Sequence, residues 1–504
     1  MGIIPILQES EVQLNLKSCF VLNPLFFLFT NFQDYPETIF LSLIKSSSKL
    51  NKHKLITFNM KRIKLLFTAM VLFAIMSDIC AQEWPQYMGP KRDNTSAQKG
   101  ILRTWPEKGP EVLWTVDVGK GFGGPVIKNG KVYLLDRKDE VEDIMRCFDF
   151  ASGKELWRFR YDALGTAMFP GSRSVPAVDG NYVYSCGHNG DLYGIDVNSH
   201  KPVWNKNVWK DFGGDKLPIW AITQCPLIYG NLLLILSQAP EAGVVAYNKL
   251  TGAVVWKTPN LGNETYASPA IVKIAGEDQI AQVISSTNPI GHKELPQTMG
   301  KIVGIRPLTG EILWEYNNWQ NHIQVASALD AGEGRVLVVG GYELGTAMIK
   351  VEKKADGSYG VKELFRHNDF GDHTKPPILY NGYFYAQFST NSKRDGLACM
   401  DMDGKVLWKT MRDPLFDKGS MILVDGLILA TDGRTKLYLI EPSPSGFKPL
   451  ASAEVLKEGG TGSENDPLAT RVGGSTQNWG PMALADGKLL IRDQTRLMCV
   501  KVAK

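Results

Sequence analysis

The sequence has little cysteine, and its cysteines form no recognisable metal or redox motif. Seven cysteines occur in 504 residues. None are adjacent and none form a Cys-x-x-Cys pair, which excludes the zinc-ribbon and thioredoxin-like motifs. The five that follow residue 81 all fall in apolar, strand-like runs. We expect these five to be buried as small hydrophobic side chains: Cys147, Cys186, Cys225, Cys399 and Cys499.

The sequence also lacks clusters of positive charge and long apolar runs. It carries 56 Lys and Arg against 52 Asp and Glu, a net charge of +4, and no basic run stands out. Phosphate binding needs a clustered positive surface, so no nucleic-acid partner is expected. The leading apolar run, residues 65–76, is shorter than the roughly 20 residues of a membrane-spanning helix, so the chain is not expected to be transmembrane.

A secretory signal peptide is predicted over residues 60–81. This stretch has a positively charged start, a short apolar core and a small residue at its end. Because a signal peptide begins at the initiator Met, we expect residues 1–59 to be an upstream extension from a mis-called start. The mature protein is then periplasmic or secreted. A lipid anchor at Cys80 is not expected, since Asp78 and Ile79 replace the small residues of a lipidation motif.

Beyond residue 110 a repeated unit dominates the sequence. One half of this unit is a turn followed by a strand that ends in an aromatic residue. Clear copies are SGKELWRF (152–159), TGAVVWK (251–257), TGEILWEY (309–316) and DGKVLWK (403–409). Weaker copies are NSHKPVWNK (198–206), with His200 in place of Gly, VKELFRH (361–367), with Phe365 in place of Trp, and SGFKPLA (445–451). The Asp-Gly and Thr-Gly turns supply the positive φ that tight reversals need.

The other half of the unit is a strand, usually begun by Pro, then a turn and an apolar strand. It occurs eight times, over residues 124–136, 175–186, 225–236, 268–284, 327–339, 376–386, 420–430 and 480–491. A third strand lies between the two halves, as in GDLYGIDV (190–197) and GKIVGIRP (300–307). Each unit of roughly 40 to 60 residues thus supplies four strands, as one blade of a β-propeller does.

The two ends of the chain predict a closed ring. The N-terminal region offers only a last strand, residues 111–119, and the C-terminal region offers only first strands before it stops. Together they complete one blade, and closure removes the exposed edges of an open array. We therefore predict an all-β fold in which residues 111–504 form an eight-bladed β-propeller of four-stranded antiparallel blades, closed by pairing of the N-terminal strand with the C-terminal blade. Residues 82–110 are expected to lie across the rim.

The repeat resembles that of the PQQ-like (pyrroloquinoline quinone) propeller family, whose units look like G-x-hhALD-x-x-TG-x-x-hW, where h is apolar. The stretch from Trp84 to Trp114 is also similar to the leader of secreted bacterial members, so the resemblance covers residues 82–504. The family includes quinoprotein alcohol dehydrogenases and the scaffold lipoprotein of outer-membrane assembly. The resemblance implies that the repeated Trp residues dock neighbouring blades and do not bind the quinone: Trp157, Trp204, Trp256, Trp314 and Trp408.

The segments that lead into each innermost strand are the candidates for a site, because these segments line the central funnel of a propeller. They hold polar and aromatic residues that a blade does not need, and loops carry function more often than strands do. The resemblance implies PQQ, with calcium, as the candidate cofactor. The residues assigned to binding are Arg173, Trp220, Gln224, Tyr266, Gln324, Lys375, Lys418, Asn478 and Trp479, and the candidate catalytic bases are Asp372, His322 and His373.

PQQ makes chemical demands that this set can meet. Its three carboxylates suit Arg173, Lys375 and Lys418, and its flat ring suits Trp220 or Trp479. A divalent ion would need oxygen ligands, and a base would take the proton of an alcohol. The sequence departs from quinoprotein alcohol dehydrogenases because it has neither the adjacent cysteines that face the quinone nor a Cys-x-x-Cys-His haem motif. This departure argues against dehydrogenase chemistry, but not against binding of a quinone-like or sugar ligand.

Two hypotheses about function remain open. In the first, an exported quinoprotein-like propeller binds PQQ in its central funnel; if it is an enzyme, it is a PQQ-dependent dehydrogenase that oxidises an alcohol or sugar. In the second, the protein is a non-catalytic envelope scaffold, or an accessory binding protein in outer-membrane assembly or polysaccharide utilisation. The cationic, aromatic funnel favours the first hypothesis. The missing cysteine pair and a mature chain of net charge near zero favour the second.

Overall fold

A computed structural model of the chain describes residues 83–504 apart from 168, 288–297, 343, 389–392 and 458–476. The predicted upstream extension, the signal peptide and Cys80 lie outside the described residues. The described part contains 33 strands and one 3-10 turn, η1 (Lys210–Phe212). Within it, no helix has the length and apolar character to span a bilayer.

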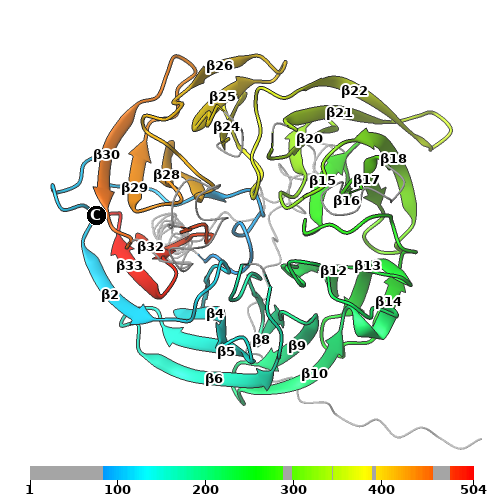
Figure 1. The fold of residues 1–504 in the computed structure, drawn as a ribbon, viewed down its shortest axis with the longest axis horizontal. Helices are drawn as coiled ribbons and strands as arrows, with labels where there is room; N and C mark the ends of the chain where they lie inside the picture. The colour runs from blue at the N-terminus through cyan, green and yellow to red at the C-terminus, as the bar shows by residue number, and fades with distance from the viewer. Residues whose placement is uncertain (1–82, 168, 288–297, 343, 389–392, 458–476) are drawn as a thin grey trace, which may run out of the picture. The chain divides into compact units, whose positions relative to one another are not determined.

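The strands form eight sheets that follow one another around a ring (Figure 1). We number the sheets as blades 1 to 8, with strands given from the innermost outward. Blade 1 is β3 (Val126–Lys128), β4 (Lys131–Lys138), β5 (Glu142–Asp149) and β6 (Glu155–Asp162), and blade 2 is β7 (Ala177–Asp179), β8 (Tyr182–Cys186), β9 (Asp191–Asp196) and β10 (Lys201–Asn207). Blade 3 is β11 (Leu227–Tyr229), β12 (Leu232–Ala239), β13 (Ala242–Asn248) and β14 (Val254–Lys257), and blade 4 is β15 (Ala270–Ile274), β16 (Glu277–Ile284), β17 (Gly300–Ile305) and β18 (Ile312–Trp319).

The second half of the ring repeats this order. Blade 5 is β19 (Leu329–Gly332), β20 (Arg335–Val339), β21 (Thr346–Lys353) and β22 (Tyr359–His367), and blade 6 is β23 (Ile378–Tyr380), β24 (Tyr383–Gln387), β25 (Leu397–Asp401) and β26 (Val406–Lys409). Blade 7 is β27 (Met421–Val424), β28 (Leu427–Thr431), β29 (Lys436–Ile440) and β30 (Pro449–Glu454), with β1 (Thr95–Ser96) added at its inner edge. Blade 8 is β31 (Ala483–Ala485), β32 (Lys488–Arg492), β33 (Arg496–Lys501) and β2 (Val112–Asp117).

Blade 8 closes the ring with strands from both ends of the chain. The N-terminal strand β2 pairs antiparallel with the C-terminal strand β33, with Trp114 opposite Cys499 and Thr115 opposite Met498. Figure 1 shows β2 at the outside of the blade beside β33. The predicted eight-bladed propeller, its four-stranded antiparallel blades and its mode of closure are therefore confirmed.

The repeated Trp residues hold neighbouring blades together. Trp204 of β10 packs on the turn that joins β13 and β14 in the next blade, where its Nε1 donates to the carbonyl of Lys249 at 2.9 Å. Gly252 in that turn leaves room for the indole, since a Cβ there would lie 2.7 Å from Trp204 Cδ2. Burial of an aromatic ring in this way adds strongly to stability at the blade boundaries that contain one.

The weakest of the Trp-containing copies shows how the same contact survives without glycine. In blade 2, His200 replaces the turn Gly and keeps the left-handed backbone, with φ 59°. Its imidazole then stacks on Trp157 of blade 1, with ring centroids 5.0 Å apart and an interplanar angle of 16°. The substitution that weakens the repeat in sequence therefore keeps the docking contact in a different form.

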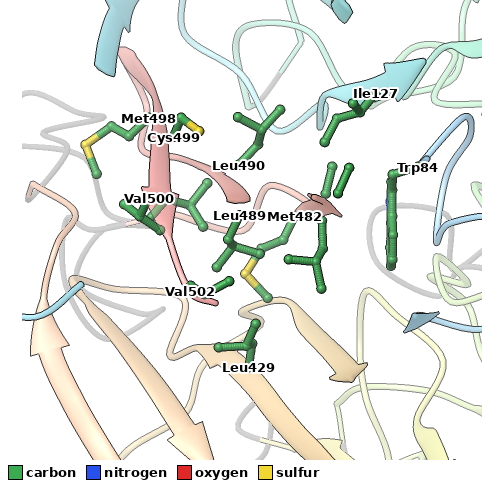
Figure 2. Packing of buried hydrophobic residues seen from close by; sticks show 14 of the residues in the cluster. Trp84, Ile127, Leu429, Met482, Leu489, Leu490, Met498, Cys499, Val500 and Val502 are labelled. Carbon is green, nitrogen blue, oxygen red and sulfur yellow. The ribbon is translucent and has the colours of Figure 1, made fainter. Parts of the chain in front are cut away.

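The hydrophobic core lies between the facing sides of adjacent blades. Alternate residues of each strand point to one neighbouring blade, as the period of a β-strand requires. Figure 2 shows one such cluster, in which Leu489 and Leu490 of blade 8 lie between Ile127 of blade 1 and Leu429 of blade 7. Trp84, from the segment before the first blade, packs into the same cluster and is 1% exposed.

Residues 83–96, which we call the strap, cross the centre of the ring before the first blade begins. Trp84 exchanges two backbone hydrogen bonds with Ile127 of β3. Further along, β1 runs parallel to β27, with Thr95 opposite Leu423. The strands β3 and β27 are the innermost strands of blades 1 and 7. Arg92, which lies between these two contacts in the strap, bonds to blades 3 and 4 on the other side of the ring. The strap therefore spans the ring axis. Figure 1 shows this segment in blue among the inner strands.

Candidate functional site

A cavity of about 180 Å³ lies on the ring axis. The segment that leads into the innermost strand of each of the eight blades contributes at least one residue to its wall, and the strap contributes Tyr87. One short segment from every repeat therefore forms part of the cavity wall. Its composition is therefore set by positions that lie about one blade apart in sequence.

The cavity brings together seven of the twelve residues that the sequence singled out. These are Arg173, Trp220, Tyr266, His373, Lys375, Lys418 and Trp479. The remaining five do not line it: Gln224, Gln324, Asn478, Asp372 and His322. The assignment of all twelve to binding or catalysis stays a prediction, and their surroundings are described below.

Lys375 and Arg173 are the two cations of the cavity that have only neutral partners. Lys375 Nζ donates to the carbonyl oxygens of Trp479 (2.9 Å) and Lys418 (3.2 Å). The Arg173 guanidinium donates to the carbonyls of Phe169 and Gly171. Loss of hydration on burial lowers the pKa of Lys375 to about 8 and that of Arg173 to about 10. An anion in the cavity would reduce the free-energy cost of burying these two charged side chains.

Lys418 is the third cation, and it combines a charge partner with an aromatic one. Its Nζ lies 2.6 Å from Oδ1 of Asp417, a carboxylate that does not itself line the cavity. The same Nζ lies 4.4 Å from the ring centroid of Trp479, within the range of a cation–π contact. Within the described part of the chain, the lining includes three cations and no Asp or Glu.

Aromatic side chains are prominent in the wall, with seven Phe, Tyr and Trp residues among its described residues. Trp479 stacks on Phe122 with centroids 5.4 Å apart, and Phe169 meets Phe122 edge-on at 6.1 Å. A second pair, Trp220 and Tyr266, is packed edge to face at 5.0 Å. The Nε1–H groups of Trp220 and Trp479 are buried and have no hydrogen-bond partner within the described structure. Buried donors of this kind are costly unless a ligand or water accepts from them.

Tyr342 marks the mouth of the cavity. It lines the cavity although it is 45% exposed, so the cavity reaches solvent beside it. Its ring lies 4.8 Å from that of His373 and 6.2 Å from that of His322. Burial lowers the pKa of His373 to about 3 and also lowers the pKa of His322. Both imidazoles are therefore neutral at pH 7.

Two residues of the lining hold a strained backbone. Tyr342 and Lys418 have φ of 55° and 56°, in the left-handed region that non-glycine residues seldom occupy. Each such residue costs about 1–2 kcal/mol. Strain of this kind gathers at functional sites, where surrounding structure enforces it.

Asp372, the predicted base next to His373, is an anchor for its own segment. Its carboxylate accepts backbone N–H bonds from Thr374 (2.9 Å), Lys375 (3.1 Å) and Gln387 (3.2 Å). Burial raises its pKa to about 6, an effect that the charge of Lys375 and these bonds oppose. The carboxylate thus fixes the segment that presents His373 and Lys375 to the cavity.

Of the three buried amides among the candidates, those of Gln324 and Asn478 tie loops together, whereas Gln224 does so through its backbone and its Oε1 has no partner among the described residues. Gln324 accepts from Trp319 Nε1 at 2.9 Å and from Asn321 Nδ2 at 2.6 Å. Asn478 donates to the carbonyls of Arg434 and Lys457. Gln224 is 4% exposed, and its backbone carbonyl accepts from Ser174 Oγ at 2.7 Å. Their hydrogen bonds hold the segments around the cavity in place.

Four aromatic residues of the lining were missed by sequence reasoning: Tyr87, Phe122, Phe169 and Tyr342. Phe122 and Phe169 precede β3 and β7, so the rule that selected the other segments could have found them. Tyr342 lies in the hairpin between β20 and β21, and Tyr87 lies in the strap. Neither residue belongs to a segment that leads into an inner strand, and neither lies at a position that recurs from repeat to repeat.

The residues present fit PQQ in kind. Indole rings suit its flat ring system, and Arg173, Lys375 and Lys418 suit its carboxylates. The volume of about 180 Å³ is below the roughly 300–1,000 Å³ of sites for drug-sized ligands. A tricyclic quinone would therefore extend to the mouth beside Tyr342. Among the described residues, no group of three or more His, Cys, Asp or Glu side chains is placed to hold a metal ion.

Comparison with known proteins gives relatives of two kinds. A sequence profile of the family described as outer membrane protein assembly factor BamB matches residues 141–410. The outer membrane protein assembly factor BamB of Moranella endobia (strain PCIT) is 21% identical over 349 residues, which cover 64% of this chain and 70% of that protein.

Solved structures with the same fold include quinone enzymes. Quinohemoprotein alcohol dehydrogenase from Comamonas testosteroni superposes with a TM-score of 0.54 at 12% identity, over 84% of this chain and 81% of that one. A europium-containing methanol dehydrogenase gives 0.54 at 13% identity, over 83% and 89%. At such identities the likeness concerns the fold alone. With the profile matching more than half of its length, the chain belongs to the PQQ-like β-propeller family.

Proposed function

We propose that this protein binds an anionic aromatic small molecule in the axial cavity, with the quinone PQQ as the first candidate. One observation carries the proposal: among the residues that the structure describes, the lining combines three cations with seven aromatic side chains of Phe, Tyr and Trp and contains no carboxylate. A buried site that offers charge of one sign is complementary to a ligand of the other sign. Ligand sites are typically apolar with a few convergent polar groups, as this one is.

Each part of the lining has a role in such binding. Trp479, stacked on Phe122, offers a face for a flat ring. The unpartnered Nε1–H groups of Trp220 and Trp479 can donate to carbonyl or carboxylate oxygens. Lys375 and Arg173 supply positive charge that their neutral carbonyl partners do not balance. Together these groups favour a ligand that is planar and rich in acceptors.

Alcohol or sugar oxidation is the activity that a bound quinone would support. PQQ supplies a two-electron acceptor when it is bound. Of the predicted bases, His373 lines the cavity, is neutral at pH 7, and has a buried Nδ1 without a hydrogen-bond partner within the described structure. Of the predicted bases it is therefore the one that can contact a substrate in the cavity, and a bound anion would have to raise its pKa before it could accept a proton effectively. Asp372 acts on the reaction through the segment that it anchors.

Titration of the purified protein with PQQ, with and without calcium, tests the proposal by quenching of tryptophan fluorescence. We expect saturable quenching at micromolar PQQ in the wild type and a weaker affinity in Lys375→Met. Lys154→Met, in an exposed turn on blade 1, serves as the matched control and should bind as the wild type does. Absence of binding at 100 µM (about a hundredfold above a micromolar Kd) would overturn quinone binding. Reduction of a dye by alcohols or sugars with bound PQQ then tests catalysis.

A second candidate function is an envelope scaffold, and the match to the assembly-factor family favours it. In this reading the protein is exported and its partners are other envelope proteins. Cell fractionation tests the export: protein expressed from Met60 should reach the periplasm or the medium, and cytoplasmic retention would contradict it. Deletion of the gene tests the scaffold role, which predicts lower levels of outer-membrane proteins. Unchanged levels together with quinone binding would decide against the scaffold.

A further inference from the structure

The strap holds a second source of positive charge, directly beneath the axial cavity. Tyr87 lines the cavity, is 8% exposed, and packs in one cluster with Val175 and Cys225 of the lining. The Arg92 guanidinium, which is not among the described residues of the lining, lies 5.6 Å from the Tyr87 ring centroid. Arg92 thus sits one ring below the floor of the cavity.

The Arg92 side chain joins two blades through neutral groups. Its Nη1 donates to the carbonyl of Pro226 at 3.1 Å and its Nη2 to the carbonyl of Pro269 at 3.4 Å. These prolines immediately precede β11 and β15, the innermost strands of blades 3 and 4. No ion pair to Arg92 is formed by the residues that the structure describes. Burial lowers the pKa of this guanidinium, which remains charged at neutral pH.

The backbone around Arg92 is bent at some cost to hold this position. Met88 and Arg92 have φ of 62° and 56°, a left-handed conformation that is unusual for both residue types. Asn94 N–H closes the loop on the carbonyl of Met88 at 3.0 Å, and Arg92 N–H bonds to Gly89 at 3.1 Å. A plug of the channel would need apolar side chains at its centre. A partly buried, unbalanced cation placed there at the expense of strain calls for a negative charge nearby.

We infer that Arg92 is a positioning residue of the ligand site: it supports Tyr87 as the cavity floor and supplies a positive potential that selects anionic ligands. The inference rests on the proposed function and deepens it, because it makes the non-repeating strap a part of the site. Arg173, Lys375 and Lys418 place positive charge in the wall of the cavity, and Arg92 adds a fourth positive charge beneath Tyr87.

Two probes that differ only in charge test the inference. Binding of 2-naphthoate and of neutral 2-naphthamide is measured by fluorescence, alongside PQQ, in the wild type and in Arg92→Gln. Removing one positive charge that has no ion-pair partner among the described residues, next to a largely buried site, should weaken naphthoate and PQQ about tenfold or more and leave naphthamide within about twofold. Arg103→Gln is the matched control, because Arg103 follows the strap but pairs with Asp425 at the surface and should leave all three affinities unchanged.

The outcomes separate this inference from the proposed function. If PQQ does not bind but naphthoate binds with the expected dependence on Arg92, the quinone assignment fails and the role of Arg92 stands. If Arg92→Gln weakens naphthamide as much as naphthoate, Arg92 acts only on structure and the inference is overturned. Arg92→Lys, which keeps the charge, should hold naphthoate affinity within about threefold of the wild type, and a tenfold loss there would also overturn it. If neither probe nor PQQ binds at millimolar concentration, both proposals are wrong.

Discussion

Replacing Gly252 with alanine should destabilise the propeller mainly through Trp204, the indole docked on that turn. Gly252 has φ +70°, and a Cβ built there would lie 2.7 Å from Cδ2 and 2.8 Å from Cε3 of Trp204. The left-handed backbone costs an alanine about 1–2 kcal/mol, and overpacking adds about 1–3 kcal/mol. We therefore expect Gly252→Ala to lower the free energy of unfolding by about 2–5 kcal/mol.

The double variant isolates the contact between the two residues. Trp204→Ala removes a ring that is 8% exposed, together with its hydrogen bond to the carbonyl of Lys249. Truncation of a buried aromatic residue of this kind should lower the free energy of unfolding by about 3–5 kcal/mol. Once the ring is absent, the three nearest contacts of the new Cβ are gone, and the backbone cost is the main one that remains. The double variant should therefore be less destabilised than the sum of the single variants, by about 1–3 kcal/mol.

Urea unfolding of the wild type, both single variants and the double variant measures this coupling. Gly230→Ala is the control, because Gly230 lies in the first turn of the same blade at φ +58° and a Cβ there would meet no atom within 4 Å. It should cost about 1–2 kcal/mol for the backbone and add to Trp204→Ala without coupling. If Gly252→Ala and Trp204→Ala are also additive, within about 0.5 kcal/mol, the docking argument is refuted.

Three further predictions concern titration and closure. Burial lowers the pKa of His188 to about 3, below its ordinary 6.5, so its contribution to stability is present above pH 6.5 and is lost as the pH falls toward 3. The free energy of unfolding should therefore depend less steeply on pH in His188→Gln than in the wild type, and equal slopes would contradict the assignment. Lys375, with a pKa of about 8, should lose its charge as the pH rises through 8, so the affinity for an anion should fall there in titrations of the wild type but not of Lys375→Arg; a flat wild-type profile would argue against Lys375 as a ligand. Removing β33 deletes the partner of β2 and β32 and should abolish cooperative unfolding observed by circular dichroism, whereas a retained transition would show that the ring tolerates opening.

The fold was predictable because each blade repeats its signals in order. The eight inner strands, the turns with positive φ and the outer aromatic residues all recur at a period that fits one blade. Closure was predictable for the same reason, since β2 lacked inner strands and the C-terminal region lacked an outer one. The path of the strap was not predictable in detail, because Trp84 pairs with Ile127 and Thr95 pairs with Leu423, partners that lie far along the chain.

The site was predictable only where it follows the repeat. Lys375, Trp479 and five others were found because they precede an inner strand and are not needed by a blade. The same rule selected Gln324 and Asn478, whose amides hold loops, since sequence does not show whether a polar side chain faces the axis or a neighbouring backbone carbonyl. Tyr87 was beyond the rule altogether, because it reaches the cavity from outside the blades.

The closed ring limits where this family can change its ligand. Residues that alternate along each strand are committed to contacts between blades, and the outer aromatic residues are committed to docking. Among the described residues, the segments before the inner strands, the strap and Tyr342 line the axial cavity and are free of these contacts between blades. A few substitutions in these segments can therefore replace one ligand by another, or abolish binding, while the fold is preserved. We expect a variant in which Arg173, Lys375 and Trp479 are all replaced to unfold like the wild type but to lose PQQ binding, and PQQ binding that persists in this variant would show that these three positions do not carry it.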